Sequence, residues 1–348
     1  MMNMIFKKTG LVVMAALCSL AVQAQDIHFS QFYETSILRN PALTGIFTGD
    51  YKVGVVYRNQ WSAISKPFQT AVVSGEMRMP VRGQKNDFVS LGLLSYYDKA
   101  GSVGLQTVTL YPALNYNKSL SSEQNSFLSV GFTGGFIQRS FDPSKATFDN
   151  QFQNGEYDPA NPTGENLPDP TFTQWDAGAG VSLNGTTGKD NNVSYVLGAA
   201  GYHFSRPKYS FANDRDINIA IRWNVNAGVS VQASEKFSYQ LHANYMNQGS
   251  YNEVIFGGLL GWNKMPPSST EVLFSIMGGL FYRLGDAIIP TVKIRYQGLS
   301  FGMSYDANLS KLTTASKLRG GYELSIIKTG LFRDPKFEKS RTLCPHFY

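Results

Sequence analysis

The sequence has few of the residues that build disulfides and metal sites. It holds two cysteines in 348 residues, Cys18 and Cys344, and Cys18 lies in an N-terminal apolar segment that we expect to be removed. The mature chain therefore has no internal disulfide to form, and Cys344 is expected to be an unpaired residue of the tail. The four histidines are far apart in the sequence, and no pair has the spacing of a zinc site.

Charge is also scarce, and catalytic motifs are missing. Only 16% of the residues are charged, and the formal net charge of +6 is scattered without a cluster of lysine and arginine, so we expect no nucleic-acid partner. No G-x-S-x-G elbow, phosphate loop or dinucleotide glycine motif occurs. We therefore expect neither a cofactor nor enzymatic activity. A barrel enzyme, the least favoured reading, needs acids and bases clustered at its outer rim, and the sequence indicates none.

Long apolar runs are missing after residue 24. The run at 10–22 follows Lys7 and Lys8 and ends in Val22-Gln23-Ala24, the build of a secretory signal peptide. We expect residues 1–24 to be removed, so that the mature chain begins at Gln25. A helix needs about 20 apolar residues to span a bilayer. If this chain crosses a membrane, it therefore does so as a closed β-barrel, because lipid offers no partner to a sheet edge.

Glycine and aromatic residues are abundant, and the dominant pattern is an alternation of period two. The chain has 33 glycines, 19 tyrosines and 23 phenylalanines, which is typical of all-β proteins. From Ile217 to Gln232 the odd positions are apolar and the even positions are mainly polar. A strand turns successive side chains to opposite faces, so this segment has one apolar and one polar wall. Its length, well beyond the usual strand of about 5–6 residues, favours a membrane strand over a soluble two-sheet protein.

The same alternation predicts fourteen strands, an even number, as in bacterial outer-membrane barrels. Tyrosines near strand ends, such as Tyr96, Tyr97 and Tyr282, suit the aromatic girdles of membrane interfaces. The sequence therefore predicts an all-β fold, a transmembrane antiparallel β-barrel of the bacterial outer membrane. The predicted strands lie near residues 51–58, 68–78, 88–97, 105–117, 126–139, 171–183, 192–203, 217–232, 237–246, 252–262, 271–282, 288–296, 299–307 and 316–327.

The lengths of the connections predict an orientation. If both termini are periplasmic, the long connection 140–170 falls outside and the tight turn 297–298 inside, as expected of outer-membrane barrels. The 140–170 segment is rich in Asp, Asn and Pro, and we expect a solvated loop rather than a calcium site. The predicted parts are a signal peptide (1–24), a periplasmic N-terminal segment (25–50), the barrel (51–327) and a periplasmic C-terminal tail (328–348).

The polar register of the predicted strands places charged side chains in the barrel lumen. Buried charges need water or one another. The lumen is therefore either a wet channel or filled by a salt-bridged plug, and fourteen strands are wide enough for both. The side chains expected to point inward are Asp176, Arg222, Lys293, Arg295, Arg319 and Glu323.

Five short motifs follow one another along the mature chain. They are Gln25–Tyr33 with Asn40–Gly45, Tyr57–Trp61, Tyr282–Pro290, Ser304–Leu312 with Gly321–Ser325, and Cys344–Tyr348. Together they resemble the PorP/SprF membrane proteins of the type IX secretion system in Bacteroidetes, with His346 standing where the family has arginine. The resemblance is strong at both ends of the mature chain and weak between residues 120 and 270.

This resemblance implies an outer-membrane barrel that helps to export or anchor secreted adhesins through their C-terminal sorting domain, as in gliding motility. The implied partners are that adhesin domain, other periplasmic or outer-membrane components of the type IX system, and the lipid bilayer. A porin-like channel for small polar solutes is the alternative from a different class. A lumen that is open to ions would favour the porin.

The family motifs single out ten positions, which are either partner contacts or structural residues. Asn40-Pro41 and Asp286 look like turn or cap residues, and Trp61 looks like an interface aromatic. We expect no catalytic, cofactor-binding or metal-binding residue. The ten positions are Asn40, Pro41, Tyr57, Arg58, Gln60, Trp61, Asp286, Pro290, Tyr305 and Asp306.

Overall fold

The computed structural model describes residues 26–62, 66–84, 86–121, 125–153, 155–165, 170–211, 217–264, 273–310 and 318–332. The predicted signal peptide and Cys344, with most of the predicted tail, lie outside these residues. Among the described residues, no helix has the length and apolar character needed to cross a bilayer.

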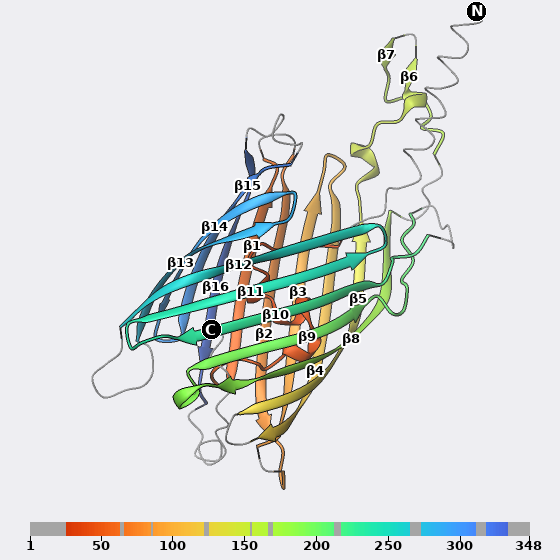
Figure 1. The fold of residues 1–348 in the computed structure, drawn as a ribbon. Coiled ribbons are helices and arrows are strands. Elements are labelled where there is room, and N and C mark those ends of the chain that lie inside the picture. Colours follow the sequence, from red (N-terminus) through yellow and green to blue (C-terminus); the bar gives the residue numbers. More distant parts are fainter. Residues whose placement is uncertain are drawn as a thin grey trace, which may run out of the picture.

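Fourteen strands close into an antiparallel barrel, as the sequence predicted (Figure 1). β1 (Tyr51–Gln60) pairs with β16 (Arg319–Gly330) to complete the ring. Two very short strands, β6 (Phe152–Gln153) and β7 (Glu156–Tyr157), form a separate hairpin in the 141–170 connection. The other barrel strands are β2 (Phe68–Pro80), β3 (Phe88–Ala100), β4 (Leu105–Ser121), β5 (Ser126–Ser140), β8 (Thr171–Thr187), β9 (Val193–Tyr202), β10 (Arg222–Gln232), β11 (Phe237–Gln248), β12 (Tyr251–Lys264), β13 (Phe274–Arg283), β14 (Ala287–Tyr296) and β15 (Leu299–Asn308).

One predicted strand is shorter than the alternation indicated. The sequence predicted a strand over 217–232, but β10 begins at Arg222. Residues before it leave the barrel wall and pair locally, with Lys208 bridging Asn218. Ile219 is consequently buried in the interior rather than facing lipid. The alternation continues through 217–221 because this local pairing is also extended, so the pattern alone did not reveal the change of partner.

Alternation along each strand separates an outer apolar wall from an inner polar wall. In β4 the side chains of Leu110 and Leu114 are exposed on the outside, whereas Tyr111 and Asn115 between and beyond them are buried inside. The outer face suits lipid, and the inner face needs hydrogen-bonding partners.

Those partners are supplied by residues 26–50, which we call the luminal segment. Residues 29–47 are all buried, and the segment lies inside the ring of strands (Figure 1). The sequence predicted a periplasmic position for residues 25–50, and the structure instead places the described part within the barrel. The physical reason is that the polar inner wall can pair its charges there. The short helical turns of the segment are η2 (Phe32–Glu34), α2 (Ser36–Arg39) and η3 (Pro41–Leu43).

The luminal segment runs from one end of the barrel to the other. Asp26 bonds Gln248 at the end that carries the connections 141–170 and 203–221, here called the long-loop end. Asp50 bonds Gly330 at the opposite, short-turn end. The first and last described residues therefore lie at opposite ends of the barrel, and the predicted periplasmic placement of the two chain termini lies outside the described residues.

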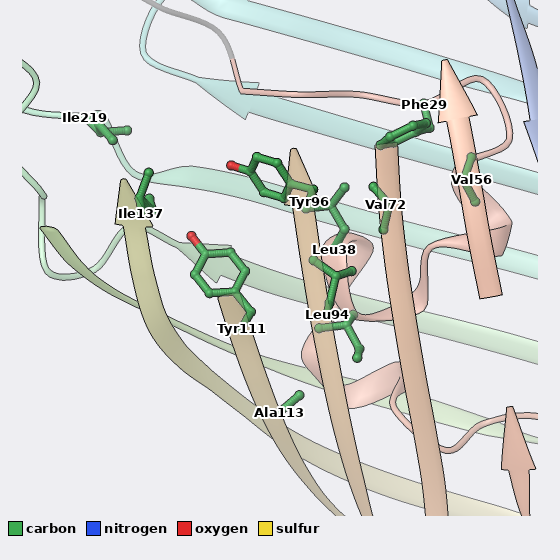
Figure 2. Packing of buried hydrophobic residues seen from close by; sticks show 11 residues of the cluster. Phe29, Leu38, Val56, Val72, Leu94, Tyr96, Tyr111, Ala113, Ile137 and Ile219 are labelled. Atoms are coloured by element: carbon green, nitrogen blue, oxygen red, sulfur yellow. The ribbon is translucent and has the colours of Figure 1, made fainter. Parts of the chain in front are cut away.

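Apolar packing joins the luminal segment to the wall at three places. Phe29 and Leu38 belong to a cluster with Val72, Leu94 and Tyr96 of the strands (Figure 2). The other two clusters are centred on Phe32 and Tyr33, and on Leu43 and Ile46. Full burial of one such side chain contributes roughly 1.5–3 kcal/mol. The segment is thus packed as a core would be, with polar bonds setting its register.

Candidate functional site: the luminal segment and the wall that holds it

A charged cluster near the long-loop end is the densest polar site of the lumen. Arg58 on β1 lies 3.1 Å from Asp306 on β15 and 3.4 Å from Glu323 on β16. Arg283 on β13 lies 3.0 Å from the same Asp306 oxygen and 3.0 Å from Asp286. The side chains that come from the strands are almost fully buried, and buried charges need a partner of opposite charge. In this cluster the arginines and the carboxylates are one another's partners.

This cluster holds the start of the luminal segment by its backbone. The Glu323 carboxylate accepts the backbone N–H groups of Ser30 at 2.6 Å and Gln31 at 2.8 Å. Arg58 donates to the carbonyl oxygen of His28, and the Ser30 hydroxyl donates to Asp306. Charge-assisted bonds of this kind are about twice as strong as neutral ones, so the segment is anchored where three strands meet.

A second polar group, the Asp26 latch, lies at the rim of the long-loop end. It consists of Asp26, Asp176, His203 and Arg222. His203 Nε2 lies 3.0 Å from Asp26 Oδ2, its Nδ1 lies 2.8 Å from Asp176 Oδ2, and Arg222 donates to Asp26. Burial lowers the pKa of His203, but the two carboxylates outweigh it and hold the pKa above its usual 6.5. Burial raises the pKa of Asp26, but Arg222 and His203 hold it below its usual range.

Further along the luminal segment, two lysines of the wall pair with buried carboxylates. Lys293 Nζ lies 2.7 Å from Glu34 Oε1, and both side chains are buried. Lys52 Nζ lies 3.2 Å from Glu76 Oε1 and donates to the hydroxyl of Ser36. Glu76 also accepts the backbone N–H of Gly45. The ion pairs therefore continue from the long-loop end toward the short-turn end.

Asn40 and Pro41 form the central turn of the luminal segment. The Asn40 side chain accepts the N–H of Ala42 at 2.9 Å, which caps η3, and donates to Asn226 at 3.0 Å. Pro41 occupies the first helical position, where its missing N–H is not needed. Gly131 of β5 lies directly beneath, because a Cβ there would come within 2.3 Å of the Ala42 nitrogen. The cap predicted for Asn40 is therefore present, although inside the barrel.

The structure brings together some of the ten motif positions and separates the others. Arg58, Asp286 and Asp306 meet in the charged cluster, and Asn40 with Pro41 lies in the central turn. The remaining positions lie in the barrel wall or at the end of β1. Tyr57, Gln60, Trp61, Pro290 and Tyr305 are half-buried or exposed there.

Two of the six charges predicted to face the lumen do not lie fully inside it. Asp176, Arg222, Lys293 and Glu323 are buried, as expected. Arg295 is only half-buried, near the end of β14, and Arg319 is exposed. The pairing of β15 with β16 shifts between Asp306 and Ala307. Such a bulge turns the residues beyond it to the other face, and Arg319 lies beyond this shift.

Sequence reasoning missed the residues that the luminal segment contributes. Asp26, Ser30 and Glu34 carry no period-two signal, because the segment has no strand. His203 follows directly after β9, and nothing in the sequence except its residue type indicated a role in the site. Lys52 on β1 and Glu76 on β2 lie at inward-facing positions of their strands. Applying the period-two alternation to these two strands would therefore have predicted that both side chains face the lumen.

Chemically, the groups of the site are engaged with the polypeptide of the luminal segment. Within the described ranges, no group of three or more His, Cys, Asp or Glu side chains is arranged to bind a metal. The carboxylates of the charged cluster face arginines, backbone N–H groups and a hydroxyl. The inner wall of the barrel thus binds a segment of its own chain.

The closed ring, the apolar outer face and the polar lumen define a barrel of the outer-membrane type. The chain belongs to the family described as type IX secretion system membrane protein PorP/SprF, whose model matches residues 21–327. The protein is therefore located in the outer membrane and is a membrane protein of that secretion system. No curated protein matches the sequence.

Comparison with solved structures finds matches at very low sequence identity. The monoaromatic hydrocarbon channel CymD is 10% identical with a TM-score of 0.46, covering 86% of this chain and 94% of that one. A deletion mutant of the channel TodX is 11% identical with a TM-score of 0.45, covering 84% and 92%. CdiB from Acinetobacter baumannii is 8% identical with a TM-score of 0.41. There the match covers 80% of this chain, which spans only 60% of CdiB.

Proposed function

We propose that this barrel is a non-enzymatic component of the type IX secretion system that helps to export or anchor secreted adhesins through their C-terminal sorting domain. Membership of the PorP/SprF family supports an interaction between this protein and other components of that system. Within the described residues, buried charges of the lumen pair with one another, as Arg58 with Asp306, and with the luminal segment, as Lys293 with Glu34. That arrangement suits a holding role more than acid–base chemistry.

The observation that carries this proposal over a porin is the filling of the lumen. A porin conducts through a water-filled interior, but here residues 29–47 of the chain are buried inside the ring. They are packed against the wall by three apolar clusters. A barrel occupied along its length favours binding of a partner at its ends over passage of solutes.

The long-loop end offers the surface for such a partner. Phe152 and Tyr157 lie opposite each other on the β6–β7 hairpin and are exposed, as is Trp175 on β8. Exposed aromatic side chains are enriched in protein interfaces. We propose that the C-terminal domain of an adhesin contacts this hairpin, and that other secretion components contact the short-turn end.

The test is an affinity purification of the tagged protein from native outer membranes, with mass spectrometry of the bound proteins. Recovery of a large surface protein through its C-terminal domain, or of type IX components, is the expected result. Replacing Phe152 and Tyr157 by alanine should reduce recovery of the surface protein. Replacing the exposed Lys189 and Glu235 in the short turns should leave it unchanged. A barrel that brings down no partner and conducts ions would refute the proposal and favour the porin.

A further inference from the structure

We infer that the barrel lumen is a binding site for polypeptide main chain, filled in this structure by the chain's own luminal segment. The inference rests on the proposed secretion function and names the class of ligand that the lumen accepts. It comes from which atoms of the luminal segment the wall contacts.

The wall bonds the backbone of the luminal segment from several strands, at residues 28–31 and again at residues 37–49. Side chains of β1, β2, β4, β9 and β10 donate to its carbonyl oxygens, and those of β2 and β16 accept its N–H groups. The donors are Arg58 to His28, Tyr202 to Ile37, Arg222 to Leu38, Asn224 to Arg39, Asn115 to Ala42 and Thr44, and Arg78 to Phe47 and Gly49, while the acceptors are Glu323 for Ser30 and Gln31 and Glu76 for Gly45.

This distribution is not what a plug that folds independently would need. Buried backbone groups must be paired, and a folded plug pairs most of them within its own helices or sheets. The luminal segment has three short helical turns, which pair some of its backbone groups, such as the N–H of Asn40 with the carbonyl oxygen of Ser36, and leave others to the wall. The wall therefore supplies bonds that secondary structure would otherwise supply, and every polypeptide carries the N–H and carbonyl groups that those bonds use.

The shape of the wall agrees with close approach of a main chain. Glycine within a strand often marks a place where another backbone comes near. A Cβ on Gly131 would lie 2.3 Å from the backbone of Pro41, and one on Gly180 would lie 2.1 Å from the side chain of Asn40. These glycines leave room for the central turn of the luminal segment.

Side-chain pairs explain why the chain's own segment occupies the site. Glu34 with Lys293, Asp26 with Arg222, and Asn40 with Asn226 join side chains of the segment to side chains of the wall, and a peptide of another sequence would lack them. A hydrogen bond to a charged group contributes about 1.5–3 kcal/mol, which corresponds to a difference of roughly tenfold to hundredfold in affinity. A peptide of unrelated sequence should therefore bind more weakly than residues 26–47, but it should bind.

The experiment makes the luminal segment exchangeable after the whole protein has folded. A protease recognition sequence is inserted between Thr48 and Gly49, the barrel is folded and purified, and the site is cut. Fluorescent peptides are then added: residues 26–47, and a scrambled peptide of the same composition. We expect both to enter the cut barrel, the scrambled peptide roughly tenfold to hundredfold more weakly, and neither to enter the uncut barrel.

Two outcomes would overturn the inference. Exchange of the native peptide alone would show a sequence-specific seal, and no exchange of either peptide would show a permanent structural plug. Heat-dependent migration in detergent gels confirms that the cut barrel is still folded. The result is separable from the proposed function, because recovery of an adhesin in the affinity purification does not depend on peptide exchange in the lumen.

Discussion

His203 is the residue whose charge the geometry determines most clearly. Each ring nitrogen lies within 3.0 Å of a carboxylate oxygen, one from Asp26 and one from Asp176. A neutral imidazole has only one N–H donor, so two carboxylate neighbours favour the protonated ring. Arg222 also contacts Asp26, and Arg139 adds positive charge nearby. The Asp26 latch therefore combines a fixed positive charge with one that titrates.

The latch should loosen as pH rises. Because the pKa of His203 is raised in the folded protein, its contribution is complete below the usual histidine pKa and is lost as pH rises through the raised value. A spin label at Ile27→Cys, in a background where Cys344 is replaced, should become more mobile as pH rises above the usual histidine pKa of about 6.5. A label at Thr48 serves as the control. Unchanged mobility at Ile27, or the same change in His203→Gln, would contradict this.

The ion pair between Lys293 of the wall and Glu34 of the luminal segment should contribute to the free energy of unfolding. Lys293→Met leaves the Glu34 carboxylate buried without its partner 2.7 Å away, which should lower the free energy of unfolding by about 3–5 kcal/mol. The double variant with Glu34→Gln should recover part of that loss, because no buried charge remains uncompensated. Urea unfolding measures both, with the exposed Lys236→Met as control. Equal stability of Lys293→Met and the wild type would contradict the assignment.

Among the elements, β5 and η3 depend on contact at one glycine. A Cβ on Gly131 would meet the backbone of Pro41 and Ala42 at 2.3 Å, whereas one on Gly278 of β13 would meet nothing within 4 Å. Gly131→Ala should therefore lower the unfolding temperature and make the luminal segment more sensitive to protease. Gly278→Ala should do neither. If both variants behave alike, the central turn does not lie against β5 as described.

Proline interrupts the ladder between β14 and β15. The pairing breaks off after Ile288 and resumes at Thr291, which leaves Pro290 opposite Tyr305 without a cross-strand bond. Proline has no N–H to donate, and lipid does not replace the missing donor. Pro290→Val should restore one bond and raise the free energy of unfolding by about 1 kcal/mol. A decrease would show that proline stabilises this position by another route.

At the scale of the whole molecule, the wall could be predicted from the sequence, but what fills it could not. Period-two alternation reports which face of a strand meets lipid, so the strands and the inward position of Arg222 and Glu323 followed from it. The luminal segment has no period, and its position depends on partners far away in the chain, such as Glu323 for Ser30. The family motifs marked Arg58 and Asp306 without showing that they meet.

The filled lumen also bears on the two functional classes that the sequence left open, and it is the basis on which we propose the secretion component over the porin. The polar inner wall alone suits a solute channel, but its side chains are bonded to the luminal segment from Asp26 to Gly49. A barrel filled in this way fits our proposal that partners bind at its two ends better than it fits a solute channel. We therefore expect ions to pass only if the luminal segment leaves.

The most direct measurement is the ion conductance of the purified full-length protein in a planar bilayer. With the luminal segment in place, we expect insertion without a steady open state, and openings only after the engineered cut between Thr48 and Gly49 and removal of the segment. Stable, porin-like conductance from the uncut protein would contradict the closed lumen and return the porin to first place.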